Sequence, residues 1–145
     1  MPGNSEFREN SQAVQAHLSI AQSVIQRMAS NSASCKAWCI TLVSAILVVI
    51  ADKGNQQYAL IAVIPTVLFL FLDAYYLALE RMFRQSYNNF IDKLHRGEVT
   101  ASDLYVVMPS GNLRKTMFSS IASFSIWPFY WTLLVMIWLA KIILL

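Results

Sequence analysis

The sequence has few charged residues for its length, and this scarcity excludes most classes of soluble protein. Asp, Glu, Lys and Arg make up 13% of its 145 residues, while 57% are hydrophobic. An ordinary soluble domain has about 25% charged and about 45–50% apolar residues. The chain is therefore too apolar for a disordered protein, and it lacks the charged surface of an ordinary soluble enzyme. A small integral membrane protein is the class that this composition favours.

Cysteine and glycine are also scarce, and each shortage excludes a kind of site. Two cysteines, Cys35 and Cys39, are too few for a disulfide scaffold, and they do not supply the four ligands of a structural zinc site. The four glycines form neither a P-loop nor a G-x-G-x-x-G motif. Arg84 and His95 match no catalytic spacing. We therefore predict a protein that is not an enzyme and that has no metal ion and no cofactor.

Three long segments are nearly free of charge and predict three transmembrane helices, because a helix crosses the bilayer core with about 20 apolar residues. The predicted spans are about 35–52, 58–79 and 117–140. Three buried helices of a soluble bundle are the alternative, but such helices would show a polar face. Lys36, at the start of the first span, is expected to reach the lipid headgroups. A kink is expected at Pro65 and at Pro128, with a gating hinge as the alternative interpretation.

The basic residues predict the orientation of these spans. Nine lysines and arginines lie before the first span, at its start or between the second and third spans, and only Lys53 and Lys141 lie on the opposite side. The positive-inside rule therefore places the N-terminus in the cytoplasm and the C-terminus outside. The first 30 residues contain no continuous apolar run of the kind that marks a signal peptide. Topology accounts for the net charge of +3, so we expect no direct DNA binding.

Residues 1–34 are predicted to form a cytoplasmic N-terminal region with one amphipathic helix. On one face of the segment from Gln12 to about Ser30, apolar residues recur at intervals of three and four, as in a heptad pattern. They are Val14, Leu18, Ala21, Ile25 and Met28. We predict that this stripe is an oligomerisation seam. The alternative is that it packs on the membrane surface or against the chain's own membrane domain.

Residues 35–145 are predicted to form the membrane domain, which includes a cytoplasmic segment over 80–116. Apolar spacing continues past the second span as far as Gly97, a natural helix stop, so we expect the second helix to extend ~25 Å into the cytoplasm. The run LYVVM at 104–108 is β-prone. A strand there would have no partner in the chain, so an irregular loop is the favoured interpretation. The six basic residues of this segment suit a cytosolic protein or a nucleotide as a trigger.

Asp73 is the most informative polar residue, since a carboxylate within a bilayer is costly and faces protein or water. At helical spacing it shares a face with Tyr76, Glu80 and Arg84, and these four residues are the candidate pore or polar intramembrane site. One interpretation is structural: Asp73 pairs with a basic residue or caps a neighbouring helix. The functional interpretations are a pore-lining ring in an oligomer and a proton-coupled site.

Most of the chain resembles a family of small bacterial three-pass membrane proteins. The likeness rests on the run IPTVLFLFLDAYYLALERMFRQSYNNF, with RMASNSASCKAW before it and SIASFSIWPFYW after it. The resemblance implies an antiphage-defence effector that disrupts the membrane after an upstream sensor is triggered. We therefore predict an all-α, homo-oligomeric, pore-forming protein of the bacterial inner membrane, with the lipid bilayer and further copies of itself as partners. A membrane-anchored adaptor and a small proton-coupled transporter subunit are the alternatives.

Overall fold

The structure is a computed structural model that describes residues 7–53 and 56–143, and the described part is helical without strands. The portions of the predicted regions at 1–6, 54–55 and 144–145 lie outside the described residues. In chain order the elements are α1 (Gln12–Lys53), the 3-10 helix η1 (Gln56–Ala62), α2 (Val63–Arg96), the 3-10 helix η2 (Ala101–Asp103), α3 (Leu113–Ile121) and α4 (Trp127–Ile143). This confirms the all-α class. Two helical stretches, Gln12–Asp52 and Tyr58–Arg96, are long and apolar enough to cross a membrane.

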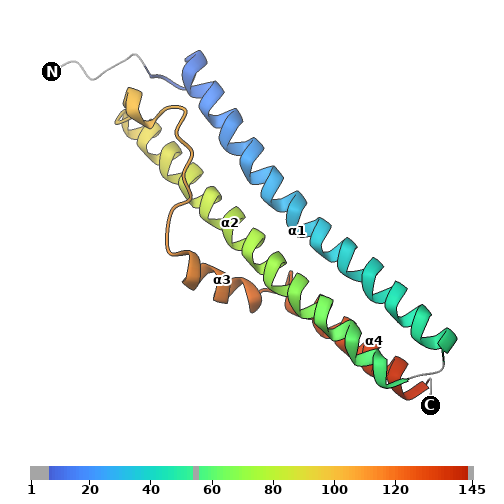
Figure 1. Cartoon of the computed structure of the whole chain (residues 1–145). Coiled ribbons are helices and arrows are strands. Elements are labelled where there is room, and N and C mark those ends of the chain that lie inside the picture. Colours follow the sequence, from blue (N-terminus) through green and yellow to red (C-terminus); the bar gives the residue numbers. More distant parts are fainter. Residues whose placement is uncertain (1–6, 54–55, 144–145) are drawn as a thin grey trace.

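Helices α1 and α2 form a long antiparallel hairpin, shown in Figure 1. They contain 42 and 34 residues, which at ~1.5 Å per residue gives lengths of about 60 and 50 Å. The ring of His17 lies against that of Phe90, with centroids 4.2 Å apart. Farther along α1, Lys36 forms an ion pair with Asp73. As residue numbers rise along α1 they fall along α2, so one antiparallel register holds over the length of the pair.

The first helix passes without a break from the polar N-terminal region into the first predicted span. The predicted boundary between residues 34 and 35 therefore falls inside one helix, and the amphipathic helix is not a separate element. The reason is that one face of α1 stays packed over the length of the helix, against α2 and, near its end, against η1. The buried residues on this face are Val14, His17, Ala21, Ser32, Cys35, Cys39, Val43 and Ile50.

The second helix extends beyond its predicted span, as expected, and ends at Arg96. Gly97 has a positive φ of 69°, a left-handed conformation that glycine adopts without the strain of a side chain. Its N–H donates to the Leu94 carbonyl, and the Glu98 N–H donates to the Lys93 carbonyl. At the other end Pro65 lies in the first turn of α2, and the 3-10 helix η1 leads into this turn without a break. The backbone changes from 3-10 to α-helical geometry beside the proline, and the kink expected at Pro65 stays a prediction.

The third apolar segment is not one kinked helix, in contrast to the prediction for 117–140. Helix α3 ends at Ile121 and α4 begins at Trp127, with a non-helical connection between them. Pro128 is the second residue of α4, so it begins a helix instead of bending one. The Ser123 hydroxyl in the connection accepts a hydrogen bond of 2.9 Å from the Arg81 guanidinium, which ties the break to α2.

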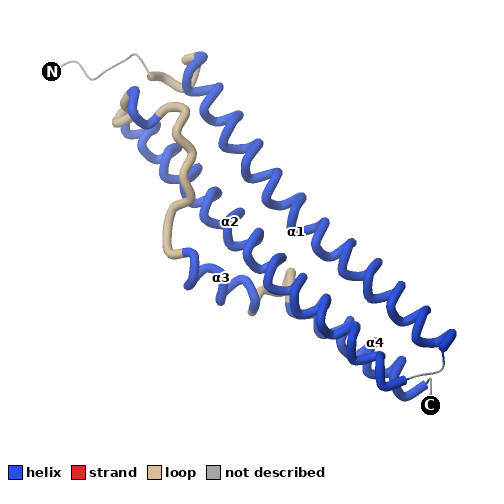
Figure 2. Tube along the Cα trace, in the orientation of Figure 1, coloured by secondary structure: helices blue, strands red, loops and turns tan. Residues whose placement is uncertain are grey.

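Residues 98–112, called the strap here, fold back over the hairpin after α2. In Figure 2 the strap is the long loop that runs from the end of α2 to α3. Leu104 and Val99 of the strap join a buried cluster with Val14, Phe90 and Leu94. The Ser110 N–H donates to the Met82 carbonyl at 3.2 Å. The run 104–108 has no strand, so the irregular loop expected there is confirmed.

The molecule has two halves that differ in the polarity of their exposed side chains. The apolar half comprises residues 37–53, η1, residues 63–79, α3 and α4; the polar half comprises residues 12–31, residues 80–96 and the strap. Large apolar side chains are exposed over most of the apolar half, among them Trp38, Val48, Ile64, Leu68, Phe71, Phe118, Trp131, Met136 and Trp138. In the polar half the exposed large apolar residues are Ile20, Tyr105, Val106 and Met108. An exposed apolar surface of this extent marks contact with a membrane or a protein.

Candidate functional site: a buried ion pair and a polar pocket

Asp73 lies at the contact between α1 and α2 with no exposed surface. The ammonium of Lys36 forms an ion pair with its Oδ2, and the Ser32 hydroxyl donates a short hydrogen bond to Oδ1. Ser32 and Lys36 are four residues apart, so they occupy successive turns of one helix face. The structure therefore supports the interpretation of Asp73 as a carboxylate paired with a basic residue. Lys36 contacts this carboxylate, and the expectation that it reaches the headgroups stays a prediction.

The compensation of this buried charge is incomplete. The Lys36 ammonium neutralises the charge through its contact with Oδ2, but this oxygen has no hydrogen-bond partner of good geometry among the described residues. The Lys36 side chain is 21% exposed to solvent, whereas the Asp73 side chain is fully buried. Removing charges from water is costly, and a buried pair repays this cost only with good geometry. The pair is thus an expensive feature at the edge of an apolar half.

The remaining members of the predicted intramembrane site do not gather around Asp73. Glu80 and Arg84 pair with each other at 2.8 Å, and the Arg84 side chain is 62% exposed. Tyr76 is half-buried, and its ring meets the ring of Tyr75 edge-on. The face predicted from helical spacing therefore runs from a buried carboxylate to a surface ion pair.

The predicted oligomerisation seam packs inside the chain. Val14 and Ala21 are buried, and Leu18 packs against the cluster that contains Phe90. Ile25 and Met28 are half-buried on the same face. The stripe therefore packs against the chain's own helices, which was the alternative interpretation, because α2 is long enough to cover it.

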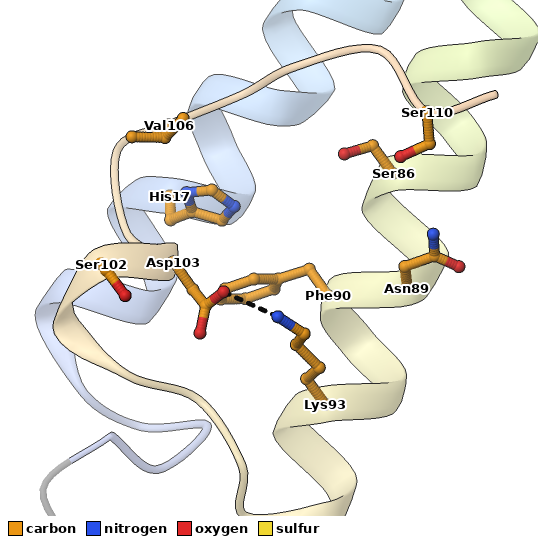
Figure 3. Close-up of a pocket in the computed structure, with 9 residues that line it drawn as sticks. All are labelled: His17, Ser86, Asn89, Phe90, Lys93, Ser102, Asp103, Val106 and Ser110. Atoms are coloured by element: carbon orange, nitrogen blue, oxygen red, sulfur yellow. Dashed lines mark hydrogen bonds and ion pairs between the residues drawn. The ribbon is translucent and has the colours of Figure 1, made fainter. Parts of the chain in front are cut away.

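A pocket of about 280 Å³ lies between α1, α2 and the strap in the polar half. Figure 3 shows side chains from all three segments around it. Its lining residues are His17, Ser86, Asn89, Phe90, Lys93, Ser102, Asp103, Val106 and Ser110. This volume is slightly below the ~300 Å³ at which ligand pockets usually begin, so the pocket has room for a small molecule at most.

His17 connects α1 to the strap and is only 5% exposed. The backbone N–H of Tyr105 donates to its Nδ1 at 3.0 Å, so Nδ1 carries no proton and the neutral ring has its proton on Nε2. Burial lowers the pKa of His17 below 6.5, and nearby Asp103 opposes this shift. Tyr105 itself has a positive φ of 64°, which is uncommon for a residue with a side chain.

Asp103 holds the strap against α2. Its Oδ1 accepts a hydrogen bond from the Lys93 ammonium at 2.8 Å, and its Oδ2 accepts from the N–H and the hydroxyl of Thr100. These donors lower the pKa of Asp103 to about 2, the Lys93 ammonium having the largest effect. The carboxylate is therefore ionised at neutral pH, with its charge balanced by Lys93.

Sequence reasoning missed Ser32, Lys36 and His17 as site residues. The helical spacing did indicate that His17 is buried, because His17 lies between Val14 and Ala21 on the same face of the helix. The partner of Asp73 depends on the register between two helices, which helical spacing within either one does not provide. No protein-family model, curated protein or solved structure matches this chain.

Proposed function

We propose that this chain is a bacterial inner-membrane protein with three spans, its polar half in the cytoplasm and its C-terminus on the opposite side. The exposed apolar surface around α1, α2 and α4 supports insertion. With 17 residues, α4 is ~26 Å long and covers most of a ~30 Å bilayer core. The excess of Lys and Arg at the polar end supports the orientation.

Accessibility of engineered cysteines to a membrane-impermeant maleimide tests this topology. The buried residues Cys35 and Cys39 are first replaced by alanine to remove the background. Asp52 and Ser102 are both exposed, at opposite ends of the hairpin. We expect labelling of Asp52→Cys in intact spheroplasts and of Ser102→Cys only after permeabilisation. The reverse pattern would overturn the orientation, and labelling of neither cysteine in intact spheroplasts would overturn insertion.

We propose further that the protein is a homo-oligomeric effector that permeabilises the membrane in response to a cytosolic event. The observation that carries this proposal is the Lys36–Asp73 pair. A helix that served only as an anchor would gain from an apolar pair at this position, whereas intramembrane ionisable residues usually serve a function. The pair is closed inside the chain, as the proposal expects of a non-conducting arrangement. Separation of α1 from α2 would expose Lys36, Asp73 and Ser32 to a lumen.

Membrane potential in cells that express the protein tests this function. We expect wild type to depolarise the membrane when triggered or overproduced, and Asp73→Asn to change the threshold because it weakens the contact between α1 and α2. Arg84→Met, which removes an exposed ion pair in the same helix, is the matched control and should behave as wild type. A monomer in mild detergent, or identical depolarisation by Asp73→Asn and wild type, would contradict the proposal.

A membrane-anchored adaptor is the second candidate, and the strap is the observation that favours it. Tyr105, Val106 and Met108 are more than half exposed on an extended segment of the polar half, as expected of a surface that docks a cytosolic protein. Unchanged membrane potential, together with a cytosolic protein that co-purifies with wild type and not with Val106→Asp, would support this candidate. The transporter alternative requires proton flux in proteoliposomes that depends on Asp73.

A further inference from the structure

We propose that the pocket between α1, α2 and the strap binds a small soluble molecule that carries a phosphate group. This inference goes beyond the proposed membrane function, since binding at the polar half requires neither a pore nor an oligomer. It rests on one buried side chain that points into the pocket, on a surplus of hydrogen-bond donors around it, and on the distance of the pocket from the membrane-facing surface.

The buried side chain is His17. Its Nδ1 is occupied by the Tyr105 N–H, and in Figure 3 its second ring nitrogen points toward the space between the strap and α2. No described residue forms a hydrogen bond with this Nε2. The ring is fixed by its contact with Phe90 at a centroid distance of 4.2 Å. This fixed N–H donor, on a side chain that is 5% exposed, is available to an acceptor held in the pocket.

The other polar groups of the pocket also favour an acceptor-rich ligand. The Lys93 ammonium has three N–H donors, of which Asp103 takes one. The Asn89 amide and the hydroxyls of Ser86 and Ser110 add donors from α2 and from the strap. The negative charge of Asp103 is already balanced by Lys93 and bound by Thr100. A phosphate group, which offers three acceptor oxygens, matches donors that come from three segments.

The wall of the pocket and its position narrow the class of ligand. Phe90 and Val106 provide an apolar side against which the organic part of a phosphate ester can lie. His17 is 19 residues from Lys36 on one continuous helix, so the pocket is ~28 Å along the helix axis from the ion pair. Phospholipid headgroups at the edge of the apolar half do not reach that far. The phosphate therefore belongs to a free solute the size of a small metabolite.

Calorimetric titration of the full chain in nanodiscs of neutral lipid tests the proposal, with adenosine monophosphate, glycerol 3-phosphate and inorganic phosphate as probes. His17→Asn keeps an acceptor near the position of Nδ1 and removes the Nε2 donor, so the strap should stay in place. We expect at least one probe to bind wild type, and His17→Asn to weaken it at least about tenfold, the usual effect of losing a hydrogen bond to a charged group. Hydrogen exchange across 98–112 should remain unchanged in this variant.

A pair of neighbouring asparagines provides a matched control. Asn89 lines the pocket, whereas Asn88 lines a separate cleft beside Arg84. Asn89→Ala should weaken binding and Asn88→Ala should not. The proposal is overturned if none of the three probes binds wild type. It is also overturned if Asn89→Ala and Asn88→Ala bind a probe with equal affinity. Binding that is abolished by anionic lipid in the nanodisc would assign the pocket to a headgroup and would also overturn it.

Discussion

Removal of either charge from the Lys36–Asp73 pair should destabilise the fold, and the two removals should have unequal effects. In Lys36→Met the carboxylate of Asp73 stays fully buried without its counter-charge. Breaking a buried pair in this way costs about 3–5 kcal/mol. In Asp73→Asn the remaining lysine side chain is already 21% exposed and its flexible stem can carry the ammonium to water. The expected cost is then about 1–3 kcal/mol, close to that of a lost hydrogen bond to a charged group.

The double variant Lys36→Met with Asp73→Leu tests the effect of removing both charges of the pair at once. Because the desolvation cost of both charges disappears, it should be within ~1 kcal/mol of wild type or more stable. Reversible unfolding in mixed micelles, followed by far-ultraviolet circular dichroism, measures all three variants. Arg84→Met is the control: its ion pair with Glu80 has a 62% exposed arginine and should contribute about 0–1 kcal/mol. The reasoning is refuted if Lys36→Met is as stable as wild type or if Asp73→Asn is the more damaging change.

Three further perturbations test the polar half. Gly97→Ala should cost about 1 kcal/mol by chemical denaturation, since φ is +69° although no atom would meet the new Cβ; no cost would contradict the strain argument. The pKa of Asp103 is lowered from 3.8 to about 2, so its stabilisation of the strap is present above pH 3.8 and is lost as the pH falls toward 2. The nuclear magnetic resonance shift of the Tyr105 amide should follow this transition, and Asp103→Asn should abolish it. Val14→Ala should cost about 1–3 kcal/mol without changing the mass of the complex in detergent, whereas Ile20→Ala, at an exposed site, should cost little; a change in mass would return the stripe to the role of a seam.

The extent of the helices was largely predictable, because it depends on local spacing and on residues with special backbone preferences. Gly97 ended α2 where its left-handed conformation allows a helix to stop. The break between α3 and α4 was not predicted, although Pro128 and the serines before it were visible. Proline is as compatible with the first turn of a helix as with a kink, and hydropathy does not distinguish these positions. The distinction depends on the contact of Ser123 with Arg81, which lies 42 residues away in the chain.

The candidate sites were less predictable than the helices, because each depends on contacts between distant segments. Asp73 could be recognised alone as a costly residue, but its partner follows from the register of α1 against α2. The pocket depends on the strap, whose sequence has no periodicity and whose position is fixed by Asp103 on Lys93 and by Tyr105 on His17. Such contacts form only when the chain has folded, and they leave no pattern along the sequence.

The pocket and the ion pair lie on one helix, α1, so a movement of α1 at the pocket would also be felt at the ion pair. His17 and Lys36 lie on the same unbroken helix, with neither glycine nor proline between them. Sharp helix bends usually need proline, glycine–serine pairs or an interrupted hydrogen-bond ladder, so α1 has no site that would absorb a local displacement. A ligand that shifts α1 relative to α2 at His17 would therefore slide or rotate the helix at Lys36 as well. Because that pair holds a fully buried carboxylate beside its counter-charge, a shift that separates the two groups costs free energy.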